Sequence, residues 1–170
     1  MMVVTGGKKA GKESFTDRLT KLEIIGVYSP IGHEMQMPFS MVLSSVLAKQ
    51  RRILYINLMQ NTGFLQLFDS QAEYDIGDLT LRLRRGTTES EQFFQSIYEM
   101  GDFSYVAPFR NPEQLGEFQM DDYRKLLAHL EENTKFDTVV FDFGTGIPSI
   151  AAFLEECSSI YCPVKEGYLL

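Results

Sequence analysis

The 170-residue sequence contains no tryptophan, only two cysteines and only two histidines. Cys157 and Cys162 are five positions apart, a spacing that fits no common metal or redox motif, so we expect reduced thiols and no metal site. The chain also has no stretch of about 18 apolar residues, which excludes a membrane-spanning helix. Because the N-terminus lacks the charged-then-apolar pattern of a signal peptide, we expect a cytoplasmic protein without direct membrane insertion.

Basic residues are scarce after the first 21 positions. Residues 1–21 carry five basic and two acidic side chains, whereas the remaining residues carry 11 basic and 21 acidic ones, a net charge of −10. Since a protein that binds a nucleic-acid backbone needs a basic face, we do not expect a nucleic-acid partner. Residues 1–21 are rich in Gly, Lys, Ser and Thr without a sustained apolar period, which predicts a flexible tail or linker before a single domain at 22–170.

Within that domain, short apolar runs alternate with amphipathic segments. Five runs have the length and composition of strands: Glu23–Tyr28, Ile53–Leu58, Phe103–Val106, Thr138–Phe143 and Ser159–Val164. Four apolar stripes at helical spacing lie between them, at 39–47, 76–83, 123–130 and 147–154. The first stripe consists of Phe39, Val42, Leu43, Val46 and Leu47. This alternation predicts an α/β fold, a doubly wound and mostly parallel sheet with helices on both faces.

The segment Ile24–Ser40 combines a strand, a turn-rich loop and an amphipathic helix. This is the local architecture of a phosphate-binding loop, and in such sheets ligands bind beyond the carboxyl ends of the strands. The segment resembles the loop of the deviant-Walker P-loop ATPases of the MinD/ParA family, most closely the CpaE-like pilus-assembly proteins and their MinD-like relatives. In that family the loop reads Lys-Gly-Gly-x-Gly-Lys-Thr.

The resemblance extends over residues 22–167. Ile53–Leu58 is similar to the second strand of the family, which usually ends in Asp-x-Asp. Residues 103–115 are similar to a strand that ends in Pro and is followed by a short Pro-Glu-x-Leu helix, and residues 136–144 are similar to the Walker B strand and second switch. The order of these matches implies a P-loop NTPase-like domain at 22–170.

Position by position, the resemblance implies that the phosphate loop has lost its chemical groups. The signature lysine falls on Ile31, two glycines fall on His33 and Met35, the phosphate lysine falls on Gln36 and the magnesium-binding hydroxyl falls on Met37. Only the first glycine remains. The degenerate phosphate-loop positions are therefore Ser29, Pro30, Gly32, His33, Gln36 and Met37.

The metal-binding side of the site has lost carboxylates as well. Asn57 and Met59 stand at the two aspartate positions of the second strand, whereas Asp142 and Gly144 persist in the second switch. Asp142 either hydrogen-bonds the helix start at 36–38 or remains as a metal ligand. The loop either presents His33, Glu34 and Gln36 as a polar recognition surface or closes on itself, with methionines filling the vacated phosphate cavity.

These replacements weaken nucleotide binding. Forcing a residue such as Met35 into a left-handed conformation costs roughly 1–2 kcal/mol. Losing the charge-assisted hydrogen bond of the lysine costs roughly 1.5–3 kcal/mol more, and the two effects lower affinity by about two to four decades. Catalysis also lacks the lysine that offsets charge in phosphoryl transfer.

We therefore expect a pseudo-ATPase with no catalytic residue and no bound cofactor. The resemblance implies a protein-interaction or regulatory module, in localisation or pilus assembly, whose partner is another protein or a second copy of the chain. The alternative is a functional nucleotide-binding ATPase of the same family, for which ATP and Mg²⁺ would be the cofactors.

Overall fold

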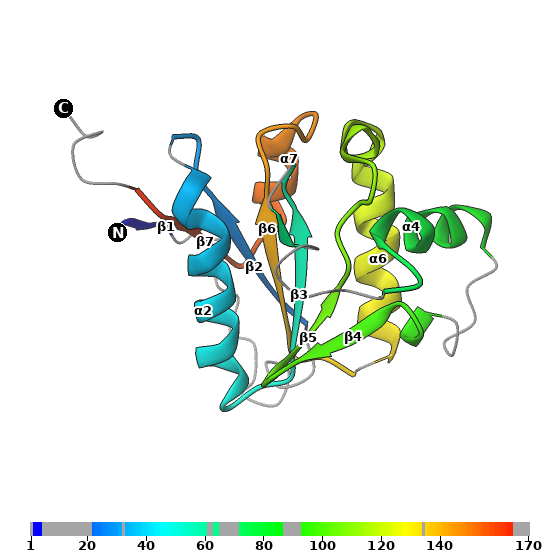
Figure 1. The fold of residues 1–170 in the computed structure, drawn as a ribbon, viewed down its shortest axis with the longest axis horizontal. Helices are drawn as coiled ribbons and strands as arrows, with labels where there is room; N and C mark the ends of the chain where they lie inside the picture. The colour runs from blue at the N-terminus through cyan, green and yellow to red at the C-terminus, as the bar shows by residue number, and fades with distance from the viewer. Residues whose placement is uncertain are drawn as a thin grey trace, which may run out of the picture.

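The structure is a computed structural model that describes residues 2–4, 22–31, 33–60, 63–64, 72–86, 93–133 and 135–164. Within these residues the strands form one seven-stranded sheet of order β1-β7-β2-β6-β3-β5-β4 (Figure 1). The strands are β1 (Met2–Val4), β2 (Glu23–Tyr28), β3 (Ile53–Leu58), β4 (Ile97–Met100), β5 (Phe103–Val106), β6 (Thr138–Phe143) and β7 (Ser159–Cys162). The five central strands are parallel, and β1 and β4 pair antiparallel at the two edges.

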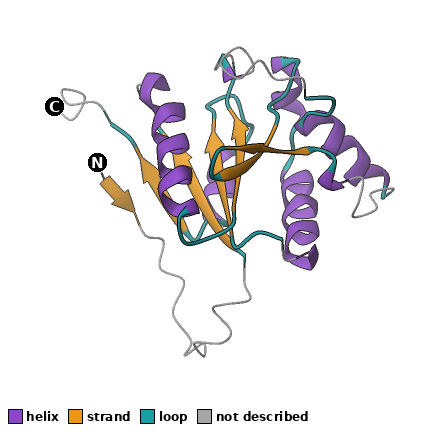
Figure 2. Ribbon diagram, turned by 60° about the horizontal axis from the view of Figure 1, so that its bottom comes forward, coloured by secondary structure: helices purple, strands orange, loops and turns teal. Residues whose placement is uncertain are grey.

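Helices cover both faces of the sheet, as the sequence predicts (Figure 2). They are α2 (Gln36–Ala48), α4 (Ile76–Arg85), α6 (Met120–Asn133) and α7 (Ile150–Glu155), with the 3₁₀ helices η1 (His33–Met35) and η2 (Pro112–Glu117). α2 packs on one face, and α4, α6 and α7 pack on the other. This arrangement confirms the predicted α/β fold with a doubly wound, mostly parallel sheet. None of the described helices is both long and apolar enough to span a bilayer.

Four of the five predicted strands have the predicted bounds, and the last ends at Cys162 rather than Val164. Every residue of β3 and β6 is buried, because helices cover both faces of the strands at the centre of the sheet. The two antiparallel edge strands were not predicted. Met2–Val4, within the predicted tail, pair with β7. Residues 5–21 lie outside the described residues, so the tail or linker remains a prediction there.

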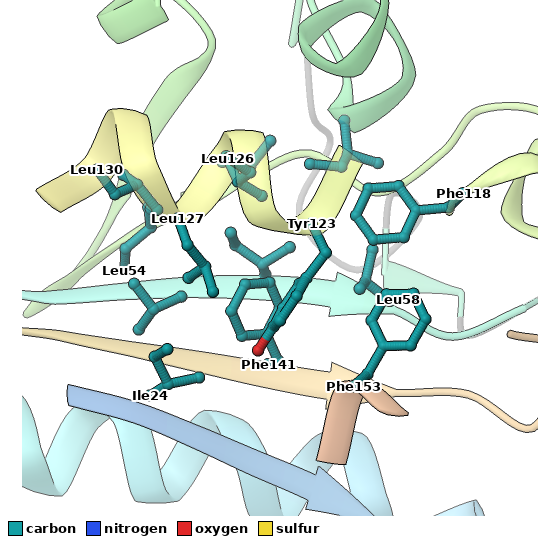
Figure 3. Packing of buried hydrophobic residues seen from close by; sticks show 14 of the residues in the cluster. Ile24, Leu54, Leu58, Phe118, Tyr123, Leu126, Leu127, Leu130, Phe141 and Phe153 are labelled. Atoms are coloured by element: carbon teal, nitrogen blue, oxygen red, sulfur yellow. The ribbon is translucent and has the colours of Figure 1, made fainter. Parts of the chain in front are cut away.

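Aromatic rings fill the core between α6 and the sheet (Figure 3). The ring of Tyr123 lies 5.0 Å from that of Phe141 and 5.1 Å from that of Phe153, measured between centroids. Cys157 lies at the margin of this cluster as a free, buried thiol, and Cys162 is free as well. Burial raises the pKa of Cys157 to about 12, so the thiol stays protonated at neutral pH. The prediction of reduced thiols is confirmed.

The histidine on α6 predicts a pH dependence of stability. The ring of His129 lies 4.4 Å from that of Phe93, and its buried Nε2 has no hydrogen-bond partner among the described residues. Burial lowers the pKa of His129 below 6.5, against an opposing effect of Glu132. The unfolded chain therefore takes up the proton first as the pH falls, and stability is lost from pH 6.5 down through the folded pKa.

We expect the free energy of unfolding, measured with urea between about pH 7 and about pH 5, to fall less steeply in His129→Leu than in the natural chain. Carboxylates also make the free energy of unfolding depend on pH, but they do so equally in both proteins. The difference between the two proteins therefore reports the contribution of His129. Equal slopes in the two proteins would contradict this assignment.

Candidate functional site

The candidate site lies at the carboxyl ends of β2, β6 and β3, where β2 leads through a loop into α2 (Figure 1). In the sheet register, Asn57 on β3 lies beside Asp142 on β6, and Tyr28 at the end of β2 lies beside Phe143. The parallel arrangement therefore brings together the predicted residues Ser29, Gln36, Asn57, Asp142 and Gly144, which come from distant parts of the sequence.

The side chain of Gln36, the first residue of α2, is the centre of this site. It is 0% exposed. Its Nε2 group lies 2.6 Å from Asp142 Oδ1, 2.8 Å from the carbonyl oxygen of Phe143 and 3.2 Å from that of Val27. Its Oε1 accepts a hydrogen bond of 2.8 Å from the backbone N–H of Ser29. One amide group thus joins the loop, the helix start and the ends of two strands.

The other carboxylate oxygen of Asp142 is held from β3. Tyr55 donates its hydroxyl to Asp142 Oδ2 at 2.9 Å, and Asn57 Nδ2 donates to the Tyr55 oxygen at 3.0 Å. Asn57 Oδ1 in turn accepts the backbone N–H of Met59 at 2.9 Å. Burial, followed by the negative charge of Asp142, raises the pKa of Tyr55 well above 10, so the phenol stays protonated and donates.

Asp142 was expected either to hydrogen-bond the helix start or to bind a metal ion. In the structure its Oδ1 accepts a hydrogen bond from Gln36 at the start of α2. Both carboxylate oxygens are used inside the protein, and the described residues contain no group of three His, Cys, Asp or Glu side chains placed to hold a metal ion. The absence of a cofactor remains a prediction. By the sequence resemblance, a thioether, Met37, stands at the magnesium-binding position, and neutral side chains, Asn57 and Met59, stand at the two aspartate positions.

Gly144 is required by a close approach of two backbones. Its N–H donates to the carbonyl oxygen of Leu58 at 2.9 Å. A Cβ atom at this position would lie 2.8 Å from that oxygen and 3.0 Å from the Cα of Met59. The residue therefore holds the ends of β6 and β3 together below the loop.

Neither predicted form of the loop matches the structure fully. Gln36 points inward and is not part of a recognition surface, whereas Glu34 is exposed. Met35 is 63% exposed and fills no cavity, and Met37 packs half-buried against the sheet on the α2 face. The loop closes through the amide of Gln36, because an amide can satisfy a buried carboxylate and buried backbone groups, which a thioether cannot.

The remaining loop positions are placed as follows. Ser29 is fully buried, and its hydroxyl donates to the carbonyl oxygen of Ile31. Pro30 is exposed, His33 begins η1, and Gly32 lies outside the described residues. Tyr55 was missed, although it lies two positions before Asn57 and therefore on the same face of the strand.

A cavity of about 350 Å³ lies away from this site, between α4 and η2. Arg84 lines it and forms a two-pronged ion pair with Asp122 at 2.7 and 2.6 Å. Burial alone would raise the pKa of Asp122, but the hydrogen bonds from Arg84 and from the backbone of Gln119 outweigh it and lower the pKa. None of the predicted site residues lines this cavity.

No protein-family model matches the chain, and no curated protein matches it by sequence. Solved structures do resemble it. A ParA family ATPase from Chlorobium tepidum TLS has a TM-score of 0.63 and 12% identity over 79% of this chain and 56% of its own. The Pyrococcus furiosus cell division ATPase MinD has a TM-score of 0.57 and 18% identity over 78% of this chain and 55% of its own.

A plasmid partition protein from Borrelia burgdorferi has a TM-score of 0.54 and 16% identity over 73% of this chain and 57% of its own. These similarities show that the chain has the fold of the ParA/MinD-type P-loop ATPases. The chain spans a little over half the length of each of these structures.

Proposed function

We propose that this chain is a degenerate, CpaE-like relative of the MinD/ParA ATPases that has lost ATPase chemistry and acts as a protein-interaction or regulatory module. The observation that carries the proposal is the position of Gln36. Where the family places the lysine that reaches the nucleotide phosphates, this side chain turns inward and binds Asp142.

Admitting a triphosphate would require the loop to open at this residue. The Gln36 amide would have to leave its three acceptors and release the Ser29 N–H, which would leave the Asp142 carboxylate with one partner fewer in a buried position. Each buried polar group left unsatisfied costs about 1–3 kcal/mol. Nucleotide binding would have to supply this free energy without the lysine, two of the three loop glycines or the magnesium-binding hydroxyl.

A domain whose nucleotide site is closed by its own side chains can still act by binding another protein through its surface. We propose that the partner is a second protein or a second copy of the chain, that the setting is localisation or pilus assembly in the cytoplasm, and that no cofactor is needed. The acidic body supports a partner other than nucleic acid, because 21 acidic and 11 basic side chains follow residue 21.

Isothermal titration with Mg·ATP tests the proposal. We expect no saturable heat, corresponding to a Kd weaker than about 1 mM. An intact ATPase of the same fold, titrated in the same buffer, serves as the positive control. A micromolar Kd for this chain would contradict the proposal and favour the alternative, a functional nucleotide-binding ATPase.

A further inference from the structure

The helix α2 has an unusual composition for a helix on the surface of an acidic protein. Its 13 residues, Gln36–Ala48, include no Asp, Glu, Lys or Arg. The chain as a whole carries a net charge of −7. A helix without charged side chains is ordinarily covered on all sides, yet one face of α2 is open among the described residues.

Polar residues share the buried face of α2 with part of the predicted apolar stripe, because Phe39, Leu43 and Leu47 pack partly buried against the core. Gln36, Ser40 and Ser44 are fully buried, and each serine hydroxyl donates to the carbonyl oxygen four residues earlier at 2.8 Å. Val42 and Val46 are instead 64% and 56% exposed. The predicted stripe is therefore confirmed for Phe39, Leu43 and Leu47, which pack against the core, and wrong for Val42 and Val46.

The open face carries an apolar row, in which Phe39 is partly buried and also contacts the ring of Tyr161 on β7, 6.1 Å away between centroids. Met35, Phe39, Val42 and Val46, which we call the outer stripe, follow one another at intervals of four, three and four residues. This is the spacing of a heptad seam, at which one helix packs against another. Three of these four side chains are among the exposed large apolar side chains of the described residues, and Ile31 is exposed close by in the chain. Scattered single apolar residues need no explanation, but such a cluster does.

We propose that the outer stripe is an interface between two copies of this chain, in which the two α2 helices pack antiparallel about a two-fold axis. The inference rests on the proposed role as an interaction module and names its partner. The axis would lie between Phe39 and Val42, so that Met35 of one copy meets Val46 of the other. The heptad intervals are symmetric about this point, which allows the same row to serve both copies.

The distribution of charge supports a second copy as the occupant. A two-fold axis places each residue near its own equivalent, so that a charged residue close to the axis meets a like charge. Two copies of an acidic chain repel each other over most of their surface, and α2 offers a helix-long surface without charge. A charged partner or an anionic lipid surface would find no complementary side chain on this helix.

The small size of the outer stripe predicts a weak affinity between the two copies. The outer stripe has four residues, whereas a standard interface buries roughly 800 Å² and about 20–30 residues per partner. We therefore expect a reversible dimer with a Kd on the order of 10–100 μM. Because the stripe lies on the side of α2 away from the Gln36 network, dimerisation requires no nucleotide.

Sedimentation velocity over a concentration series, with and without Mg·ATP, tests this interface. We expect the natural chain to change from monomer to dimer as concentration rises, equally in both conditions. Val42→Glu should weaken the dimer at least about tenfold, because it places two carboxylates beside the axis. A mixture of Val42→Glu with Val42→Lys should recover the dimer. Leu81→Glu is the matched control, because Leu81 is an exposed apolar residue (44%) on a different helix, and should leave association unchanged.

Thermal unfolding of each variant shows whether it is folded. Because Val42 is largely exposed, we expect Val42→Glu to fold like the natural chain. A natural chain that stays monomeric at all concentrations, or a dimer that Val42→Glu leaves intact, would overturn the inference. A dimer that forms only with Mg·ATP would contradict the proposed function, whereas a nucleotide-independent dimer abolished by Val42→Glu would support both proposals.

Discussion

Replacing Gln36 with leucine should lower the free energy of unfolding by about 3–5 kcal/mol. The leucine fills a similar volume, but it leaves the Ser29 N–H and the carbonyl oxygen of Phe143 without the partner that Gln36 provides. It also removes the hydrogen bond from Gln36 to the buried Asp142 carboxylate. Urea unfolding followed by circular dichroism at neutral pH measures the difference.

Ser44→Ala is the matched control for this experiment. Ser44 is fully buried on the same face of α2, but among the described residues its hydroxyl bonds only to the carbonyl oxygen of Ser40 within the helix. We expect a change of less than about 1 kcal/mol, because alanine favours the helix and that carbonyl oxygen keeps its other lone pair. A Gln36→Leu variant as stable as Ser44→Ala would mean that the amide network contributes little to the fold.

Gly144→Ala should destabilise the protein by about 2–3 kcal/mol. The added methyl group would lie 2.8 Å from the Leu58 oxygen and 3.0 Å from the Met59 Cα, so it meets backbone atoms that cannot rotate away. The ends of β6 and β3 would have to separate, which would weaken the hydrogen bond from Gly144 N–H to Leu58. Chemical denaturation measures the change.

Gly116→Ala is the control for the added methyl group. No atom lies within 4 Å of a Cβ built at Gly116, so this variant should be as stable as the natural chain or slightly more stable. If Gly144→Ala were equally harmless, the ends of the two strands would have more freedom than their close contact implies.

Much of the fold could be predicted from the sequence because the central strands are apolar along their whole length. A strand covered on both faces requires such a run, and Thr138–Phe143 and Ile53–Leu58 have it. The edge strand β4 was missed because Ile97–Met100 is only partly buried and includes an exposed glutamate, Glu99. A half-exposed strand of four residues leaves little periodic signal.

The sequence predicted where the candidate site lies but not which side-chain contacts it contains. The resemblance identified the positions that meet at the strand ends, and the structure brings Gln36, Asn57 and Asp142 together there. It gave no indication that a glutamine would turn inward, since the same residue type is usually exposed. Three polar residues, Gln36, Ser40 and Ser44, take the most buried positions of α2, so the hydrophobic pattern alone placed Val42 and Val46 on the wrong side.

The strand order has a consequence for biosynthesis. β2 lies between β7 and β6, both of which come from the last 35 residues of the chain. During translation, the apolar segment Glu23–Tyr28 is synthesised well before the two strands with which it pairs in parallel. Gln36 likewise precedes its hydrogen-bond acceptor, Asp142, by 106 positions. This apolar segment therefore stays unpaired until β6 and β7 have been synthesised, more than 100 residues later, and is open to aggregation during that time.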